Sequence, residues 1–333
     1  MSTSSIRLGV IGAGHWGANL IRNCAELGIL HVVCDTEPTA LDSVEAAYPG
    51  VVTTTDVDWL LKSPIHGVIV ASPAHLHAPL ARRAIAAGKH VFVEKPFALT
   101  VADAEMVASD ADRAGLVSFA GHVLLYHPAV QRLLELVRAG AIGRVVHARS
   151  RRMGLGRLRE HESVWWSFAP HDVALVLELF GESPTHVTGA QHRATNHPLA
   201  DFAYADANFN RGGSAHIEVS WLDPEKCSRF DVFGTAGVLS FNDAPTGGTL
   251  TLTRCAIEER SGNGRVIRGE PPENILVPEA QPLRTELETF LSAIETGEPT
   301  LSGGRQAVEV VRMLAALDAV ASAPALEEVS IAL

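Results

Sequence analysis

Two residues of this chain have a type and a position suited to moving a proton. The first is Lys95, in the run Glu94-Lys95-Pro96, directly after an apolar stretch that predicts a buried strand. Pro96 biases Lys95 toward an extended backbone and cannot continue the strand's ladder. An ammonium group at a strand end can orient a hydroxyl and stabilise negative charge on its oxygen. The alternative is a solvated Glu94–Lys95 ion pair at a strand end, which is a common arrangement.

The second residue is His171, which follows Pro170 and precedes an apolar run that ends at Phe180. The pattern predicts a helix over residues 172–180, with His171 near its N-terminus. The helix dipole disfavours an imidazolium at that end, and a neutral imidazole suits a general base. Asp172 is interpreted as a first-turn acid that stabilises the helix. A capping or hydrogen-bonding core histidine is the alternative, and it holds for most of the 15 histidines.

A group of arginines is the third chemical signal, unusual in a chain with a formal net charge of −11. Guanidinium groups match the geometry of carboxylates and phosphates. Neighbouring positions on a strand face opposite sides, so these arginines cannot all touch one ligand. A solvated loop or a salt-bridge patch between subunits is the alternative. The arginines are Arg149, Arg151, Arg152, Arg157 and Arg159.

The elements that must position these residues begin with a glycine-rich turn. Gly12, Gly14 and Gly17 form a G-x-G-x-x-G turn between the apolar run 6–11 and a helical pattern. This strand–turn–helix context is the dinucleotide-binding fingerprint. Gly12 permits the tight turn, Gly14 lets the backbone approach a pyrophosphate, and Gly17 lets helix and strand pack closely.

An acidic residue completes the fingerprint. Asp35 ends the next strand, about 20 residues further on, where its carboxylate can accept hydrogen bonds from a ribose and would repel a 2′-phosphate. Since no arginine follows it in residues 36–38, the predicted cofactor is NAD and not NADP. Loops at the carboxyl ends of neighbouring strands belong to the same crevice. The predicted cofactor-binding residues are Gly12, Gly14, His15, Trp16, Gly17, Asp35, Ser72, Pro73, His77, Glu94 and Lys95.

Periodicity divides the chain in two. Alternating strands and helices up to residue 122 predict an α/β domain with a doubly wound parallel (Rossmann) sheet. From residue 144 onward, period-two strands predict a second α/β domain, residues 123–333, with a large, mostly antiparallel open sheet. One sheet face would be covered and the other free for a partner subunit. Residues 258–278, rich in Gly, Pro, Glu and Arg, are predicted to be a surface excursion.

Composition excludes several classes of function. The 333 residues are 47% hydrophobic and 20% charged, as in globular proteins. The acidic balance without a basic block argues against nucleic acid as a partner. The four cysteines lack metal-ligand spacing, so no metal is predicted, and free thiols fit a reducing compartment. No apolar run is long enough to cross a bilayer and no leader pattern is present; we therefore expect a cytoplasmic protein without a membrane partner.

The segments AGKHVFVEKP and PHDV, together with GAGHWG, resemble the Gfo/Idh/MocA family, named after glucose–fructose oxidoreductase, inositol dehydrogenase and a rhizopine-catabolism protein. The resemblance covers essentially the whole chain. It implies a Rossmann domain followed by an α/β domain whose open sheet often forms the interface of a homodimer or homotetramer. It also implies reversible hydride transfer between a nicotinamide and a ring carbinol of a sugar or inositol. Lys95 would then lie near the nicotinamide and the reacting hydroxyl, and His171 would be the acid/base.

The segments GHVLLYHPAV, RRMGLGRLRE and VWWSFAPHDV resemble, more narrowly, the branch of the family that oxidises C3 of UDP-N-acetylglucosaminuronic acid. In that branch a 2-keto acid can serve as the final hydride acceptor. The arginines would face the pyrophosphate or carboxylate of the substrate. The substrate-binding residues implied in this way are Lys95, Tyr126, Arg152, Arg157, Arg159 and His171.

The chain departs from the family pattern at two places. Many members carry an aspartate four residues before the histidine; here the position is Ser167, so an aspartate-assisted relay is not expected. The branch usually has asparagines in the arginine loop, where this chain has Arg151 and Gly154. Two other functions stay open: a dehydrogenase of a free sugar, sugar phosphate or inositol, and a non-catalytic NAD-binding regulatory protein.

Overall fold

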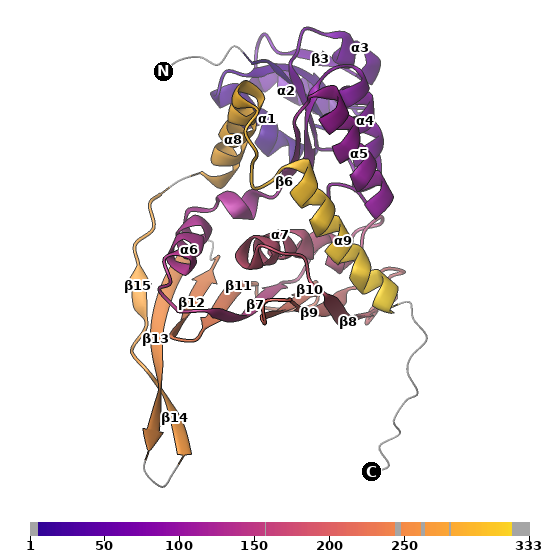
Figure 1. Ribbon diagram of the computed structural model, residues 1–333. Coiled ribbons are helices and arrows are strands. Elements are labelled where there is room, and N and C mark those ends of the chain that lie inside the picture. Colours follow the sequence, from indigo (N-terminus) through magenta and orange to yellow (C-terminus); the bar gives the residue numbers. More distant parts are fainter. Residues whose placement is uncertain (1–5, 157, 244–247, 261–263, 280, 322–333) are drawn as a thin grey trace.

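The fold consists of two β-sheets, one above the other in Figure 1, with helices on and between them. The structure is a computed structural model that describes residues 6–156, 158–243, 248–260, 264–279 and 281–321. Within these residues no helix is long and apolar enough to span a membrane.

The first sheet is parallel throughout, with strand order β3-β2-β1-β4-β5-β6 among the described residues. Its central strands are continuous apolar runs because helices cover both of their faces. The doubly wound sheet predicted from the sequence is thereby confirmed. Its strands are β1 (Leu8–Ile11), β2 (Leu30–Cys34), β3 (Val52–Thr54), β4 (Gly67–Val70), β5 (His90–Glu94) and β6 (Ser118–Gly121).

The helices of this part follow the strands in alternation (Figure 1). The α5 helix begins after the N-cap Thr100, whose side chain accepts a hydrogen bond from the Asp103 N–H, and ends at Gly115 in the left-handed conformation. The helices are α1 (Gly17–Glu26), α2 (Pro38–Ala47), α3 (Val57–Lys62), η1 (Ala74–Leu76), α4 (His77–Ala86) and α5 (Val101–Ala114).

The second sheet is mostly antiparallel, as predicted, with the order β14-β13-β12-β11-β7-β10-β9-β8 in the described part of the chain. Its centre is β7, which pairs parallel with β10 and antiparallel with β11. The strands are β7 (Val145–Met153), β8 (His186–His192), β9 (Phe202–Asn208), β10 (Ser214–Ser220), β11 (Cys227–Gly234), β12 (Gly237–Asn242), β13 (Thr249–Arg260), β14 (Gly264–Gly269) and β15 (Glu273–Ile275).

One face of this sheet is covered by α7 (Val164–Phe180) and α6 (Pro128–Arg138) (Figure 1). Alternate residues of β7 point to it: Ser150 and Arg152 both reach Asp172 on α7. Arg149, which precedes Ser150 and so points to the opposite face, instead bonds Asp231 of β11. The predicted division of the arginines between two faces is confirmed.

The start of α7 corrects a prediction. The helix begins at Val164, after the N-cap Ser163, and Pro170 lies inside it. His171 is therefore in the third turn and not at an N-terminus, and Asp172 is not a first-turn acid. A proline at the first helical position and a proline within a helix look alike in sequence, because both precede a helical residue.

The described part of residues 258–278 is mostly exposed, as predicted for a surface excursion, but the sequence did not indicate that it contains strands. β13 continues to Arg260 and pairs with β14 as a projecting hairpin, and β15 returns along β13 (Figure 1). Ile257 and Ile267, directly opposite each other in it, are both exposed. Strands exposed on both faces lack the apolar–polar alternation on which the prediction depended.

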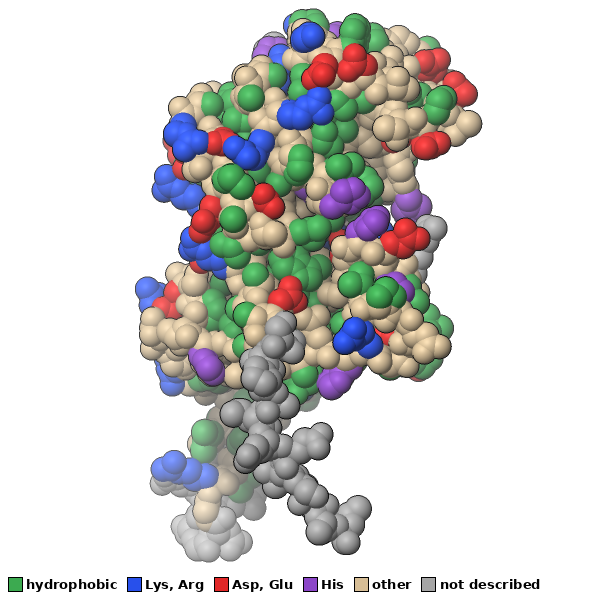
Figure 2. All heavy atoms as spheres, turned by 90° about the vertical axis from the view of Figure 1, so that its right-hand side faces the viewer, with side chains coloured by type: hydrophobic (Ala, Val, Ile, Leu, Met, Phe, Trp, Pro, Cys, Tyr) green, Lys and Arg blue, Asp and Glu red, His purple; other side chains and the backbone are tan. Residues whose placement is uncertain are grey.

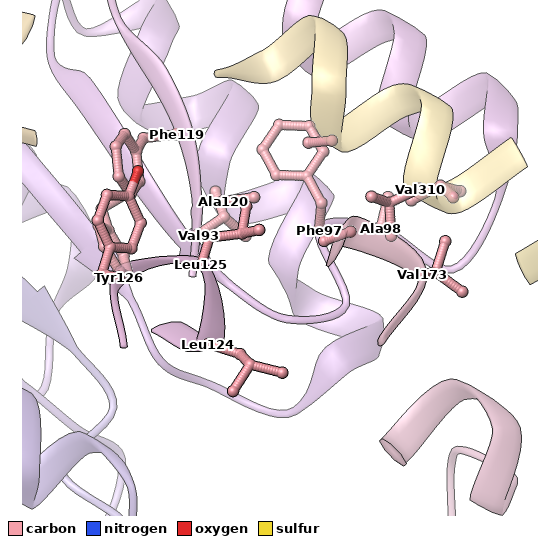
Figure 3. Packing of buried hydrophobic residues seen from close by; sticks show 14 of the residues in the cluster. Val93, Phe97, Ala98, Phe119, Ala120, Leu124, Leu125, Tyr126, Val173 and Val310 are labelled. Atoms are coloured by element: carbon pink, nitrogen blue, oxygen red, sulfur yellow. The ribbon is translucent and has the colours of Figure 1, made fainter. Parts of the chain in front are cut away.

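The last two helices join the two sheets. α8 (Pro282–Thr296) packs against α1 and η2 (Val123–Tyr126), whereas α9 (Gly304–Ala321) contacts α5, α7 and β8 (Figure 1). Between these elements lies a continuous apolar core, which includes Phe97, Phe119 and Val310 (Figure 3). The sequence-based division at residue 122 stays a proposal, since these C-terminal helices pack on both parts.

Candidate active site

The glycine turn has the geometry that its three glycines predict. Gly12 has φ +104°, and a Cβ there would lie 2.5 Å from the Ala71 carbonyl oxygen. A Cβ on Gly17 would overlap the carbonyl of Gly12, whereas one on Gly14 would meet nothing within 4 Å. The turn is therefore closed on its protein side and open at Gly14, where a pyrophosphate can approach the backbone.

Asp35 lies beside this turn, as a ribose-binding residue must. Its Oδ2 accepts a hydrogen bond from the Ala13 N–H at 2.5 Å, and its Oδ1 accepts one from the Glu37 N–H at 2.9 Å. Each carboxylate oxygen has a second lone pair, so the fixed carboxylate can still accept from a ribose. These features fit a bound NAD.

His77 was predicted to bind the cofactor, but its ring is used within the protein. The side chain is buried; Nε2 contacts the Ser72 carbonyl oxygen at 2.8 Å and Nδ1 that of Pro96 at 2.7 Å. The ring thus joins the loop after β4, which contains Ser72 and Pro73, to the loop after β5. Its ring nitrogens are not available to a ligand, so His77 acts by positioning those loops.

A hydrogen bond crosses the crevice between the glycine turn and β5. The Trp16 indole Nε1–H donates to Glu94 Oε1 at 2.6 Å, and the Lys95 N–H donates to Oε2 at 3.2 Å. Burial raises the pKa of Glu94 to about 7, although these hydrogen bonds and the Lys95 charge act in the opposite direction. His15 and Trp16 are both exposed and directly precede α1.

Lys95 reaches from the end of β5 to the second sheet's helix. Its Nζ donates a hydrogen bond to the backbone carbonyl of Ser167, one turn before His171 on α7, at 3.0 Å. Burial lowers the pKa of Lys95; the carboxylates of Glu162 and Glu94 oppose this change. The predicted lysine and histidine are therefore brought together from positions far apart in the chain.

His171 is held in its neutral form, but not by the helix dipole that the sequence suggested. Burial lowers its pKa well below 6.5, and the charges of Lys95, Arg152 and His122 lower it further. Its Nδ1 is fully buried while the residue as a whole is partly exposed, so the open edge of the ring carries Nε2. A neutral imidazole with Nε2 accessible can act as a general base.

Arg152 is engaged in a buried ion pair. Its Nε and Nη2 donate to the two oxygens of Asp172 at 2.8 and 3.1 Å, and its Nη1 donates to Ser228 Oγ at 2.9 Å. The Asp172 carboxylate is almost fully buried and also accepts from Ser150. A substrate contact by Arg152 would therefore have to share the guanidinium with Asp172.

The other predicted substrate-binding residues differ in placement. Arg159 is exposed, 3.8 Å from Glu162, and its charge acts on Lys95. Tyr126 lies in the core, where its ring stacks on Phe119 (Figure 3) and is nearly fully buried, so the structure does not bring it to the crevice. Arg157 lies outside the described residues.

Two residues of this site were missed from the sequence. The Glu162 carboxylate is the charge that most favours the protonated form of Lys95. It also lines a pocket of about 410 Å³, together with Trp166 and Arg193. His122 is fully buried after β6; the charge of Lys95 lowers its pKa, and a charge on His122 lowers the pKa of His171. Only its place at the carboxyl end of a Rossmann strand could have indicated His122, and no pattern marked Glu162.

The described surface is mixed in charge on the face shown in Figure 2. Acidic and basic side chains alternate over it, and histidines gather at the level between the two sheets. That face therefore carries no basic patch of the kind that binds nucleic acid.

Family models match two long stretches of the chain. One, described as an oxidoreductase family with an NAD-binding Rossmann fold, matches residues 6–122, and the other, the GFO/IDH/MocA C-terminal domain, matches residues 130–240. The chain belongs to the Gfo/Idh/MocA family and is an NAD-dependent oxidoreductase.

Individual relatives agree with this assignment. The UDP-N-acetylglucosamine 3-dehydrogenase of Acidithiobacillus ferrooxidans is 28% identical over 305 residues, which cover 90% of this chain and 92% of that protein. A solved structure of that dehydrogenase matches with a TM-score of 0.82 and 27% identity, covering 95% of this chain and 99% of the other. A solved oxidoreductase from Magnetospirillum magnetotacticum is 31% identical with a TM-score of 0.79, covering 94% and 100%.

The three glycines permit a matched pair of substitutions. Gly17→Ala should lower the melting temperature and abolish NAD binding, because the new Cβ overlaps the Gly12 carbonyl. Gly14→Ala should leave the melting temperature unchanged within about 2 °C, since single surface changes rarely exceed about 0.5 kcal/mol, yet weaken NAD binding. Thermal unfolding and calorimetric titration with NAD measure both effects. Equal NAD affinity in Gly14→Ala and the unchanged protein would show that the open side of the turn does not bind the cofactor.

The Trp16–Glu94 hydrogen bond should respond to pH. Since the pKa of Glu94 is about 7, the carboxylate forms as pH rises through 7 and accepts more strongly from the indole. We expect a tryptophan-fluorescence transition centred near pH 7 that is absent from Glu94→Gln and Trp16→Phe. Trp59→Phe, which removes an exposed indole on α3, is the control and should keep it. A transition that persists in Trp16→Phe would contradict this assignment.

Proposed function

We propose that this protein oxidises the C3 carbinol of a UDP-linked N-acetylhexosamine or of the corresponding uronic acid, with NAD as the hydride acceptor. The observation that carries the proposal is the hydrogen bond from Lys95 to the Ser167 carbonyl, since it fixes an ammonium next to the neutral ring of His171. The similarity to a UDP-N-acetylglucosamine 3-dehydrogenase over 90% of the chain supports the substrate class.

The site residues divide the chemistry between them. His171 Nε2 takes the proton of the substrate hydroxyl, while the Lys95 ammonium orients that oxygen and stabilises the charge that develops on it. NAD, when bound, accepts the hydride from the carbon that carries the hydroxyl. Glu162 and Glu94 favour the ammonium form of Lys95 against the effect of burial. Burial and neighbouring cations keep His171 unprotonated at neutral pH.

A nucleotide sugar also requires groups for its anionic part. Arg159 is exposed, and its charge is close enough to Lys95 to lower the pKa of that residue. We assign the contact with pyrophosphate or carboxylate to Arg159. Arg152, in contrast, is held in its ion pair with Asp172, so we do not assign the anion contact to it. The pocket next to Glu162 provides space beyond the reacting centre for a large substituent.

A single-turnover assay tests the function. NADH absorbance is followed at near-stoichiometric enzyme with UDP-N-acetylglucosaminuronic acid, UDP-N-acetylglucosamine, glucose, glucose 6-phosphate and myo-inositol, each with and without 2-oxoglutarate. We expect a burst with a UDP-sugar only. A burst with a free sugar or inositol would keep the dehydrogenase chemistry and reject the nucleotide-sugar substrate.

The same assay tests the roles of the two central residues. Lys95→Ala and His171→Ala should each lower turnover by about 10²–10⁴-fold with NAD affinity retained. The acid limb of kcat/KM should lie below pH 6.5, because protonation of a base with a depressed pKa abolishes activity only at lower pH. Near-normal turnover of either variant would remove that residue from the mechanism.

Charge reversal at Arg159 tests the anion contact. Arg159→Glu should raise KM for the UDP-sugar at least about tenfold, since hydrogen bonds between charged groups contribute about 1.5–3 kcal/mol, with kcat little changed. Arg132→Glu, at an exposed arginine on α6, is the matched control and should leave KM unchanged. An unchanged KM in Arg159→Glu would exclude this arginine as the anion-binding group.

A further inference from the structure

The pocket of about 410 Å³ lies where the start of α7, the end of β8 and the C-terminal part of α9 meet (Figure 1). Its volume is in the range of sites for small molecules. His161 lines it, and the centroid of the His161 ring lies 4.9 Å from that of His75 in η1, which follows a strand of the Rossmann sheet. Trp166 also lines it and directly precedes Ser167, whose carbonyl accepts from Lys95. The pocket therefore adjoins the crevice that contains the reacting centre.

Hydrogen bonds within the protein fix the polar groups of this pocket. The Asp318 carboxylate accepts from Trp166 Nε1 at 2.7 Å and from Gln191 Nε2 at 2.5 Å. Because a carboxylate only accepts, these bonds orient the Gln191 amide, whose Nε2 has a second hydrogen and whose Oε1 has two lone pairs. Arg193 donates from Nη1 to the Pro198 carbonyl at 3.4 Å and lines the same pocket. Gln191 and Arg193 together can offer a ligand two donors and one acceptor.

The charges around the pocket disfavour an anion inside it. Two carboxylates, those of Glu162 and Asp318, line the pocket together with a single guanidinium, that of Arg193. Arg159, to which the pyrophosphate contact is assigned, lies beside it, with its Nε 3.8 Å from Glu162 Oε1. A nucleotide sugar whose pyrophosphate is held by Arg159 would therefore place an uncharged, polar part of the molecule in this pocket.

We propose that this pocket binds the uracil base of the substrate. Uracil has two carbonyl acceptors, O2 and O4, on either side of its N3–H donor, so two donors and one acceptor complement that edge. Gln191 supplies the acceptor and one donor, and Arg193 supplies the other donor. Trp166, Leu99 and Leu199 provide apolar surface for the ring. The inference deepens the proposed function and rests on it, since it requires a UDP-linked substrate.

The same edge distinguishes uracil from cytosine. Cytosine has an amino donor where uracil has the O4 acceptor, and an acceptor where uracil has N3–H. A freely turning amide would adapt by exchanging the positions of its oxygen and nitrogen. The hydrogen bond to Asp318 prevents this exchange, because it keeps Nε2 of Gln191 in place. The pocket is therefore expected to prefer uridine nucleotides to cytidine nucleotides.

Binding of probes that do not react tests the pocket. In calorimetric titrations of the full-length protein saturated with NAD, UDP should bind at least about tenfold more tightly than CDP. Arg193→Ala should weaken UDP binding at least about tenfold and leave the binding of inorganic pyrophosphate, which has no base, unchanged. Arg144→Ala is the matched control and should change neither affinity, because Arg144 is also exposed and its Nη1 also donates to a loop carbonyl, that of Gly212, at 3.5 Å.

A second variant tests the discrimination between bases. Gln191→Leu removes the acceptor and one donor, so UDP and CDP should bind to it with equal affinity. Since this change also removes a bond to Asp318, thermal unfolding is measured alongside, and Arg193→Ala, at an exposed position, decides the outcome if Gln191→Leu does not fold. In turnover with UDP-N-acetylglucosamine both variants should raise KM with kcat little changed, as for lost uniform binding. Equal affinity of the unchanged protein for UDP and CDP, or unchanged UDP affinity in Arg193→Ala, would overturn the proposal.

The two proposals fail in different ways. If the NADH burst requires a UDP-sugar while UDP binds no more tightly than CDP, the uracil pocket is wrong and the proposed function stands. If the burst occurs with a free sugar or inositol instead, the nucleotide-sugar substrate is rejected, and the uracil pocket is rejected with it.

Discussion

The site depends on one hydrogen bond, from the Lys95 ammonium to the backbone carbonyl of Ser167. It joins the carboxyl end of β5, a strand of the Rossmann sheet, to α7, the helix that covers the second sheet. Pro170, inside α7, has no N–H to donate to the Trp166 carbonyl, so the helical ladder is interrupted one residue before the carbonyl that Lys95 uses. Because the acceptor belongs to the backbone, the spacing between Lys95 and His171 follows from the path of α7.

The same physical effect acts on both central residues with different outcomes. Burial disfavours the charged form of a lysine and of a histidine alike. For Lys95 the nearby carboxylates of Glu162 and Glu94 counteract it, whereas for His171 the nearby charges are cationic and reinforce it. The site therefore contains a neutral hydrogen-bond acceptor, His171, beside a cationic donor, Lys95. The charge of Lys95 is one of the causes that keep His171 neutral.

Sequence reasoning succeeded where a signal is local. The apolar pattern predicts helices over residues 57–62 and 101–114, and α3 and α5 have these bounds, because their signals lie in or directly before each helix. The start of α7 was misplaced because Pro170 fits two helical positions. The roles of His122 and Glu162 depend on neighbours more than 20 residues away along the chain, Lys95 and His171 among them; such neighbours become visible only when the strands are assembled. His171 was predicted to be neutral because of the helix dipole, whereas in the structure burial and the nearby cations lower its pKa.

The closure of the first sheet has a consequence for synthesis of the chain. β6 is an edge strand, and its backbone is covered by residues near the C-terminus: the Ala120 N–H donates to the Ser302 carbonyl at 2.8 Å, and Phe119 bridges Gly303. On the ribosome, residues 118–121 emerge long before residues 302–303 exist. An uncovered strand edge is a template for pairing with other chains. The edge of β6 is therefore uncovered during the interval between the synthesis of residues 118–121 and that of residues 302–303.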